Sequence, residues 1–339
     1  MVHKVVIAED NLSGHRYNYV RTLTEGAVRR GWEVVVLTTP QEHAARFEEL
    51  QALSVEIRLA AHHSPACLAE TAERCSAHLV VVPDGDRLAL RLAFTRWTGP
   101  ATLRVLVMRA NAQPRKLRVQ TLVAQRLRQG LFWVAERQRD VQLRYLTSAL
   151  RTDLSLPWVQ DPIQFEPTPV PSEALPDGVS WVGILGAIDE RKNVPEVYAA
   201  VREARDERCG LLLAGRLSSD VRAMVDQLPP DIPVYVIDRH LSNGELDAFV
   251  AAVSVVVVAH SNESPSGIMG KAVAAGTRIL AAGAKTLRED CSLIGPGAVW
   301  VPLSAEDLAA GLKIALEQPR PQPRPVGSEA FIERLLSAE

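Results

Sequence analysis

The stretch SVVVVAHSNESPSGIMGKAVAAGTRILAA, from Ser254 to Ala282, decides the fold of this chain. It opens with an apolar run, Val255 to Ala259, which is typical of a strand buried on both faces of a parallel sheet. A polar loop, His260 to Ser266, follows, Gly267 leads into a helical segment of small residues, and Ile279 to Ala282 is the next expected strand. A strand, a polar loop and a helix start present unpaired backbone N–H groups at the carboxyl edge of a sheet. This pattern predicts a site for an anion such as a diphosphate, although an ordinary strand-loop-helix unit has the same spacing.

Composition is that of an ordinary soluble globular protein and excludes several classes. Its 339 residues predict two domains, each long enough to bury a core. The formal net charge of -2 gives no electrostatic case for nucleic-acid binding. No signal peptide and no apolar run of roughly 20 residues is visible, so we expect a soluble, cytoplasmic protein. The cysteines show no metal-binding spacing and are expected to be reduced thiols: Cys67, Cys75, Cys209 and Cys291.

The first half of the chain begins with a parallel βαβ unit. Lys4 to Ala8 and Glu33 to Thr38 are the expected strands, and the segment from Arg16 to Arg30 between them has helical periodicity. Only Gly14 precedes this helix, so the dinucleotide fingerprint is missing and an NAD enzyme is not expected. Further strands are expected at Ser54 to Leu59, Leu79 to Val82 and Leu103 to Met108.

A basic segment follows. Between Arg104 and Arg151 there are eleven Arg or Lys residues against two acids, Glu136 and Asp140. Apolar residues within it have helical spacing, which predicts a helix with its apolar face on the core and its basic face outward. These apolar residues are Val119, Leu122, Val123 and Leu127. We favour a solvated helix face, and the alternative is peripheral contact with an anionic membrane surface or an acidic acceptor.

Prolines divide the chain. Because five of them lie between Asp161 and Asp177, that segment cannot be helical and is interpreted as a linker. We therefore expect an N-terminal domain over residues 1–165, a linker over 166–178 and a C-terminal domain over 179–318. Residues 319–339 form a proline-rich segment and a last helix, Glu329 to Ser337, expected to pack back across the domains.

Two loops of the second domain carry the expected binding chemistry. The strand from Val179 to Leu185 ends at Gly186, and the charged loop that follows contains Arg191 and Lys192. Two α/β domains joined by a linker are expected to face each other across a cleft, which this loop and the loop from His260 to Gly267 would line. Cations and backbone amides suit a phosphate, and a carboxylate suits sugar hydroxyls. Together they predict a nucleotide sugar as the ligand.

At these residues the chain resembles the GT-B glycosyltransferases, and specifically the retaining enzymes of glycosyltransferase family 4. WVGILGAIDERKNVPEVYAAV (181–201) and LLLAG (211–215) are similar to the first loop and next strand of the family's donor domain. Glu263 to Ala282 is similar to the donor signature, in which two glutamates bracket seven residues. GHRYNYVRTL (14–23) resembles the opening loop and helix.

The chain departs from the family pattern at three positions. The second signature glutamate, which holds the ribose in the family, falls at Lys271. The arginine that follows the first-loop glycine falls at Ala187, so that either Arg191 takes its place or no residue does. Gly267 lies one position later relative to Glu263 than in the common form.

The resemblance implies transfer of a sugar from a nucleoside diphosphate to an acceptor with retention of anomeric configuration. Lys192, Arg191 and the amides of Gly267 and Ile268 would stabilise the charge that grows on the leaving diphosphate. Glu263 would accept hydrogen bonds from the donor sugar. No metal or other cofactor is expected, because the chain has no metal-binding DxD motif on the appropriate strand and no histidine cluster.

Other residues complete the predicted site. The remaining donor-binding candidates are Gly14, His15, Gly186, Ser264, Ser266 and Lys271, and the acceptor-side candidates are Arg16, Asp84 and Asp86. The expected acceptor is a carbohydrate, a lipid-linked acceptor or a small molecule. Simpler roles stay open: Arg191 and Lys192 as surface charges, Glu263 as a helix cap, and the aspartates as turn residues. Two other functions stay open, a nucleotide-sugar epimerase and a catalytically degenerate GT-B binding protein.

Overall fold

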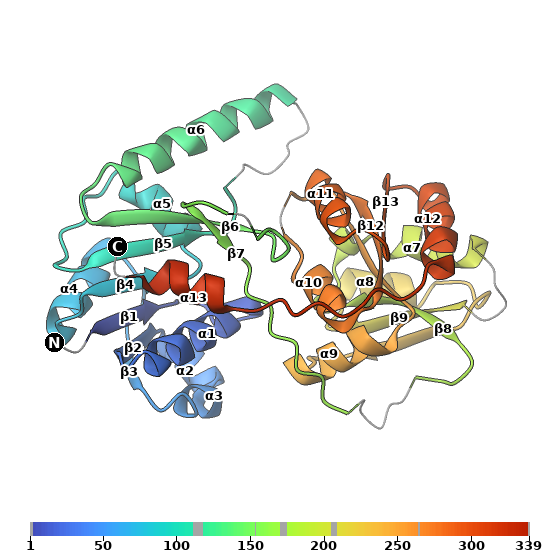
Figure 1. Ribbon diagram of the computed structural model, residues 1–339, viewed down its shortest axis with the longest axis horizontal. Coiled ribbons are helices and arrows are strands. Elements are labelled where there is room, and N and C mark those ends of the chain that lie inside the picture. Colours follow the sequence, from blue (N-terminus) through green and yellow to red (C-terminus); the bar gives the residue numbers. More distant parts are fainter. Residues whose placement is uncertain are drawn as a thin grey trace. The chain divides into compact units, whose positions relative to one another are not determined.

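The computed structural model describes residues 3–110, 118–152, 154–169, 175–204, 209–263 and 265–337. The chain divides into two compact units, each built on one parallel sheet (Figure 1). Unit 1 comprises Met1–Thr147, Thr152–Pro162 and Ser328–Glu339, and unit 2 comprises Ser148–Arg151 and Ile163–Gly327. The expected architecture of two α/β domains with parallel sheets is confirmed.

Unit 1 has a seven-stranded sheet in the order β3-β2-β1-β4-β5-β6-β7. All of its strand pairs are parallel, and β1 lies between β2 and β4, with Val6 opposite both Val35 and Val80. Its central strands are apolar runs because helices cover both faces of the sheet. The strands are β1 (Lys4–Ala8), β2 (Glu33–Thr38), β3 (Glu56–Leu59), β4 (Leu79–Val82), β5 (Thr102–Val107), β6 (Val141–Thr147) and β7 (Trp158–Gln160).

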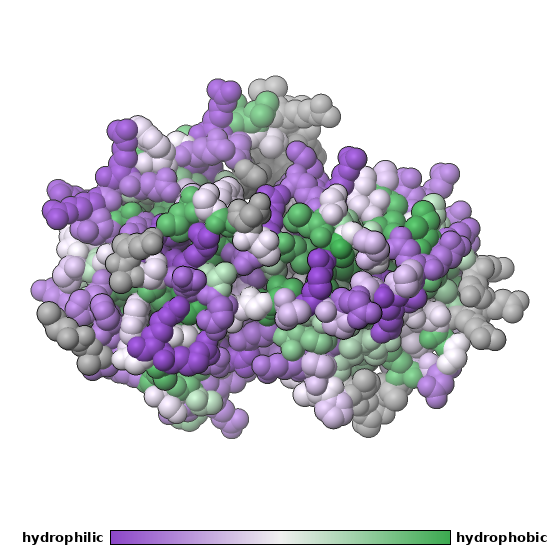
Figure 2. Space-filling model, viewed as in Figure 1, coloured by the Kyte–Doolittle hydropathy of each residue, from purple (hydrophilic) through white to green (hydrophobic). Residues whose placement is uncertain are grey.

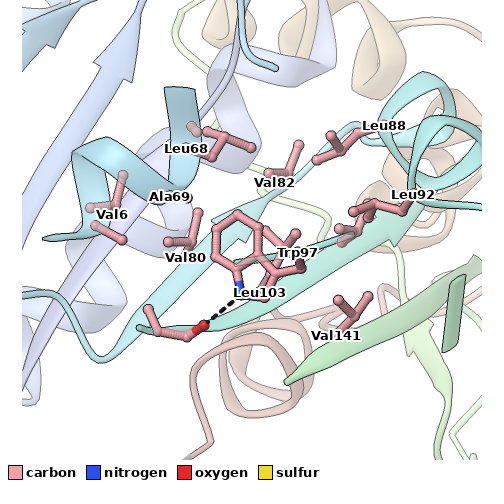
Figure 3. Close-up of a cluster of buried hydrophobic side chains, with 14 of the residues drawn as sticks. Val6, Leu68, Ala69, Val80, Val82, Leu88, Leu92, Trp97, Leu103 and Val141 are labelled. Atoms are coloured by element: carbon pink, nitrogen blue, oxygen red, sulfur yellow. Dashed lines mark hydrogen bonds between the residues drawn. The ribbon is translucent and has the colours of Figure 1, made fainter. Parts of the chain in front are cut away.

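Helices cover the two faces of this sheet. The helices of unit 1 are α1 (His15–Arg29), α2 (Pro40–Ala45), α3 (Phe47–Gln51), α4 (Pro65–Cys75), α5 (Asp86–Leu92), α6 (Arg118–Glu136) and α13 (Glu329–Leu336). α4, α5 and α6 pack on the face that carries Val6, and α1 and α13 pack on the face that carries Ile7. Figure 3 shows part of the first core, where the buried Trp97 indole N–H donates to the carbonyl of Ala101 at 2.9 Å.

Unit 2 has a six-stranded parallel sheet in the order β10-β9-β8-β11-β12-β13. Its strands are β8 (Ser180–Leu185), β9 (Cys209–Gly215), β10 (Val234–Asp238), β11 (Val255–His260), β12 (Arg278–Gly283) and β13 (Ala298–Val301). A 3-10 turn (Glu190–Lys192) follows β8, and the helices are α7 (Val194–Glu203), α8 (Ser219–Val225), α9 (Asn243–Ala252), α10 (Gly267–Ala275), α11 (Lys285–Ile294) and α12 (Ala305–Glu317). α7, α8 and α12 cover one face, and α9, α10 and α11 cover the other.

The last helix belongs to unit 1. The predicted helix is confirmed as α13, and its contacts are with α1, β4 and β7. Phe331 and Leu335 are fully buried there. Arg104, a residue of β5 that is only 1% exposed, closes the end of the helix, because its Nη1 donates to the carbonyls of Leu335 (2.9 Å) and Ser337 (3.0 Å). Arg104 is therefore a buried capping residue and contributes no charge to the surface.

The orientation of α6 corrects a prediction. Leu122, Val123 and Leu127, expected to face the core, are 61%, 62% and 64% exposed. The helix instead packs through Phe132 and Ala135, which lie on the opposite side of the helix, against α5 and β6. The spacing correctly predicts a helix with an apolar face, but it cannot say which face turns inward. In the described part of the chain, no helix is long and apolar enough to cross a membrane.

Some elements went unrecognised in the sequence. Strands β6 and β7 lie within the basic segment and just after it, and α5 begins at Asp86, where only a turn was expected. The alternating pattern of β6 (VQLRYLT) is a strand signal that the high Arg content concealed.

Candidate functional site

The strand order of unit 2 reverses direction between β8 and β11, which are adjacent in the sheet. Loops that leave the carboxyl ends of two such strands run in opposite directions and leave a crevice, where α/β proteins bind their ligands. The loops after β8 and β11 are the two that the sequence analysis singled out. The structure therefore brings the turn at Gly186–Asn193 and the turn at His260–Gly267 to the same edge of the unit 2 sheet.

Direct contacts join these two turns. The Asn193 side-chain amide donates to the carbonyl of Ala259 at 2.9 Å, which ties the first turn to the end of β11. Gly186 has φ of +92°, a conformation that favours glycine, and an added Cβ there would lie 3.7 Å from the Cδ1 atom of Ile268. Because Ile268 is the second residue of α10, the glycine turn lies beside the N-terminus of that helix.

Lys192 is the cation of the first turn for which the described residues provide no counter-ion. In the described residues its ammonium makes no ion pair, and burial lowers its pKa, an effect that nearby Asp189 opposes and Arg191 reinforces. Arg191 differs, because its Nε and Nη2 atoms contact the Asp189 carboxylate at 3.0 and 2.5 Å and its side chain is 64% exposed. A bound anion would stabilise the partly buried ammonium of Lys192 more than the guanidinium of Arg191, because the guanidinium is solvated and already paired.

His260 is a residue of this edge that the sequence analysis did not select. It ends β11, is 6% exposed, and its Nδ1 has no hydrogen-bond partner among the residues described. Burial and, next, the Lys192 cation lower its pKa to about 4. The imidazole is therefore neutral at pH 7, and Lys192 is the nearby charge that affects it most. The only signal in the sequence was a histidine directly after a buried strand.

The second turn offers backbone donors. Ser266 is the N-cap of α10, and its hydroxyl accepts from the N–H of Met269 at 3.3 Å. An α-helix leaves the N–H groups of its first turn without intrahelical partners, so the amides of Gly267 and Ile268 point out of the helix start. Together with the helix dipole they favour a bound anion. Ser264 lies outside the described residues.

Two side chains predicted to contact the donor, Glu263 and Lys271, make contacts with other residues of the chain. The carboxylate of Glu263 accepts from the backbone N–H groups of Lys285 and Thr286, both at 3.0 Å, and so caps the N-terminus of α11. The ammonium of Lys271 contacts Oδ1 of Asp247 at 2.5 Å and donates to the carbonyl of Gln164 at 2.8 Å. Their roles toward a donor stay predictions. Asp247, the buried partner of Lys271, was not recognised, because 24 residues of sequence separate the two.

Unit 1 carries its own group of polar residues, also at a reversal of strand order, between β1 and β4. Gly14, at φ of +60°, precedes α1, and Arg16 of that helix contacts Asp84 (Nε to Oδ2, 2.5 Å). Burial lowers the pKa of His15, against the opposing charge of Asp84. Glu9, which follows β1, is 2% exposed, and burial and the charge of Asp84 raise its pKa well above the usual range.

Asp86 has a different environment from Asp84. Its Oδ1 accepts from the backbone N–H groups of Met108 (2.9 Å) and Arg109 (3.2 Å), and its Oδ2 lies 3.2 Å from Nη2 of Arg128. The structure thus brings His15, Arg16 and Asp84 together. Asp86 instead accepts hydrogen bonds from the loop after β5 and so holds that loop in place. Among the residues described, no group of three metal-ligating side chains is present.

Comparison with known proteins identifies the fold. No family model matches the chain, and no curated protein matches it by sequence. Solved structures do. WaaG, a glycosyltransferase involved in lipopolysaccharide biosynthesis, is 16% identical with a TM-score of 0.55, and the match covers 93% of this chain and 90% of WaaG. Sucrose-phosphate synthase from Thermosynechococcus elongatus is 14% identical with a TM-score of 0.58, covering 98% and 92%.

A putative UDP-N-acetylglucosamine 2-epimerase from Listeria monocytogenes matches at a similar level, with 13% identity, a TM-score of 0.57, and coverage of 100% of this chain and 96% of the epimerase. Identities this low establish architecture alone. Two parallel-sheet α/β units, with seven and six strands and matches over nearly the whole length, give this chain the GT-B fold of glycosyltransferases.

Proposed function

We propose that the protein is a glycosyltransferase that takes a sugar from a nucleoside-diphosphate donor bound at the β8–β11 edge of unit 2. The observation that carries this proposal is Lys192, a partly buried ammonium without an ion-pair partner in the described residues. It lies at the reversal of strand order, in the turn that contacts the N-terminus of α10. These features together suit a diphosphate.

The proposed chemistry places positive charge where the leaving diphosphate becomes negative. When the glycosidic bond breaks, charge grows on the diphosphate, and Lys192 and the amides of Gly267 and Ile268 stabilise it without reorganisation. Arg191 contributes once it exchanges Asp189 for the phosphate. Glu263 keeps its cap on α11 and offers its remaining lone pairs to the donor sugar. None of these steps requires a metal ion.

Retention of anomeric configuration is part of the proposal. Its support is the resemblance of residues Glu263 to Ala282 and Gly186 to Asn193 to retaining family 4 enzymes. In unit 1, Gly14, His15 and Arg16 are proposed to contact the donor or acceptor, with Asp84 orienting Arg16. The anomeric configuration of the product, read by NMR coupling constants, tests retention.

The first experiment incubates the protein with UDP-, GDP- and dTDP-sugars and measures release of nucleoside diphosphate. With an active donor, Lys192→Ala is expected to lower turnover about a hundredfold or more, as loss of one transition-state charge partner does. Lys313→Ala, at an exposed lysine of α12, is the matched control and should not change the rate. A rate for Lys192→Ala within twofold of the wild type would remove Lys192 from this role.

The same panel separates the alternative functions. Interconversion of the donor sugar without an acceptor would favour an epimerase, the function printed for one structural match. Binding of a nucleotide sugar by calorimetry with no turnover on any donor or acceptor would favour a degenerate binding protein.

A further inference from the structure

The outer face of α6 is apolar. Among the side chains of this helix that the structure describes, five large apolar ones are exposed to solvent: Leu122 (61%), Val123 (62%), Leu127 (64%), Trp133 (54%) and Val134 (41%). At 100° per residue they share one half of the helix circumference, opposite Phe132 and Ala135, which are buried. Contiguous exposed apolar surface of this kind marks an interaction site.

The inner side of the same helix accounts for this orientation. In its middle turns the side facing unit 1 carries Arg128, whose guanidinium contacts Asp86 (3.2 Å) and donates to the carbonyl of Arg109 (3.0 Å). Polar contacts thus hold that side of the helix, and the apolar residues are left outside. The outward position of Leu122, Val123 and Leu127 follows from how unit 1 packs.

A further exposed apolar residue lies in a segment held to the end of the helix. Gln138, just after α6, donates through its side-chain amide to the carbonyls of Leu92 (2.5 Å) and Thr95 (3.0 Å). Phe94, which lies between these two residues in sequence, is 81% exposed. Phe94 is thus a further exposed apolar residue in the segment that Gln138 ties to the C-terminal end of α6.

Positive charge surrounds this surface. From Arg87 to Asp140 the sequence contains twelve Arg or Lys residues and two acids, Glu136 and Asp140, in a chain whose formal net charge is -2, and of these cations Arg104 is buried. Exposed cations lie on α6, on α5 beside it, and in the segments that follow them: Arg87, Arg91, Arg96, Arg126, Arg137 and Arg139. Figure 2 shows hydrophobic and hydrophilic residues side by side along the upper margin, where Figure 1 draws α6.

We propose that the outer face of α6 docks unit 1 on an anionic lipid bilayer. Exposed Leu, Val and Trp side chains among arginines, with Glu136 and Asp140 as the nearby exposed acids in sequence, resemble the composition of helices that lie in the plane of the membrane interface. Trp133 suits that depth, because indole rings favour the headgroup level, and Arg137 stacks over it at 3.7 Å. A second copy of the chain is a poorer fit, since a symmetric contact would bring Arg126 and its neighbours against the same cations.

The test uses the full chain and sedimentation with vesicles of phosphatidylcholine alone or with 40% phosphatidylglycerol. We expect binding only to the anionic vesicles, weakened by salt. The triple variant Leu122→Ser, Val123→Ser, Leu127→Ser should weaken binding about tenfold or more, because it removes most of the inserted apolar surface. Arg126→Glu alone should weaken it about fivefold or more, since each cation near such a surface contributes on the order of 1 kcal/mol.

The controls change matched residues of unit 2. Leu293→Ser with Ile314→Ser removes apolar side chains that are 48% and 50% exposed, and Lys313→Glu reverses an exposed charge. Neither should change vesicle binding. The proposal is overturned if the wild type does not bind anionic vesicles or if the α6 variants bind as well as the wild type. It is also overturned if the wild type is a dimer by sedimentation velocity and the triple variant a monomer, since a second copy then covers this face.

Discussion

At the scale of single residues, burial and the Lys192 cation have the largest effects on the pKa of His260, and the backbone of Asn262 and the charge of Glu263 oppose them. Burial and the cation disfavour the charged imidazole and lower its pKa to about 4, from about 6.5 in an unfolded chain. The folded pKa is below the unfolded one, so the unfolded state binds more protons between these values. The stabilisation is therefore complete above pH 6.5 and is lost as the pH falls toward 4.

We accordingly expect the free energy of unfolding to depend on His260 in mildly acid solution. Between pH 7 and pH 5 the wild type should lose about 2 kcal/mol more than His260→Asn, measured by urea unfolding. His240→Asn, an exposed histidine of the same unit, is the control and should follow the wild type. Parallel pH profiles for the wild type and His260→Asn would contradict the proposed burial of a neutral imidazole.

At the scale of elements, Lys271 joins two helices of unit 2. The residue lies on α10 and reaches Asp247 of α9, whose side chain is 2% exposed, and the other oxygen of Asp247 accepts from the N–H of Glu166. A glutamate at position 271 would place a second carboxylate against a buried one. The cation at position 271 thus forms an ion pair between two helices of unit 2.

Lys271→Glu should therefore destabilise unit 2 by about 3 kcal/mol or more, because it leaves the buried Asp247 without its partner and adds repulsion. Thermal unfolding, followed by circular dichroism, measures the loss. Lys285→Glu makes the same charge reversal on α11, where the side chain is 80% exposed, and should cost less than about 1 kcal/mol. Equal stability of the two variants would mean that the ion pair with Asp247 contributes little.

At the scale of the whole molecule, the chain returns to the unit in which it began. α13 completes the core of unit 1 with Phe331, Ile332 and Leu335. An added Cβ at Gly26 of α1 would come within 2.5 Å of Ile332, so this glycine permits the close approach of the two helices. Unit 1 is thus built from segments at both ends of the sequence.

Phe331→Ala is expected to lower the stability of unit 1 by about 3–5 kcal/mol, the usual cost of a large cavity in a core. Hydrogen exchange followed by mass spectrometry should show faster exchange in β1, β4 and α1, with the strands of unit 2 unaffected. Ile314→Ala, on α12 and 50% exposed, is the control for a truncation at the surface. Equally increased exchange in both units would show that they unfold together.

Much of this architecture was predictable from local sequence. Strands buried on both faces of a sheet are continuous apolar runs, such as Val255 to Ala259, and each run is followed by a polar loop and a helix. This repeated pattern predicted both parallel sheets and the two turns of the candidate donor site. Only the tertiary structure decided what individual side chains contact. In the tertiary structure, the apolar side of α6 faces outward, Lys271 forms an ion pair with Asp247, and Glu263 caps the start of α11. Lys192 has no counter-ion among the described residues. Each of these depends on groups far apart in the sequence, and periodicity reports which residues share a face but not what that face meets.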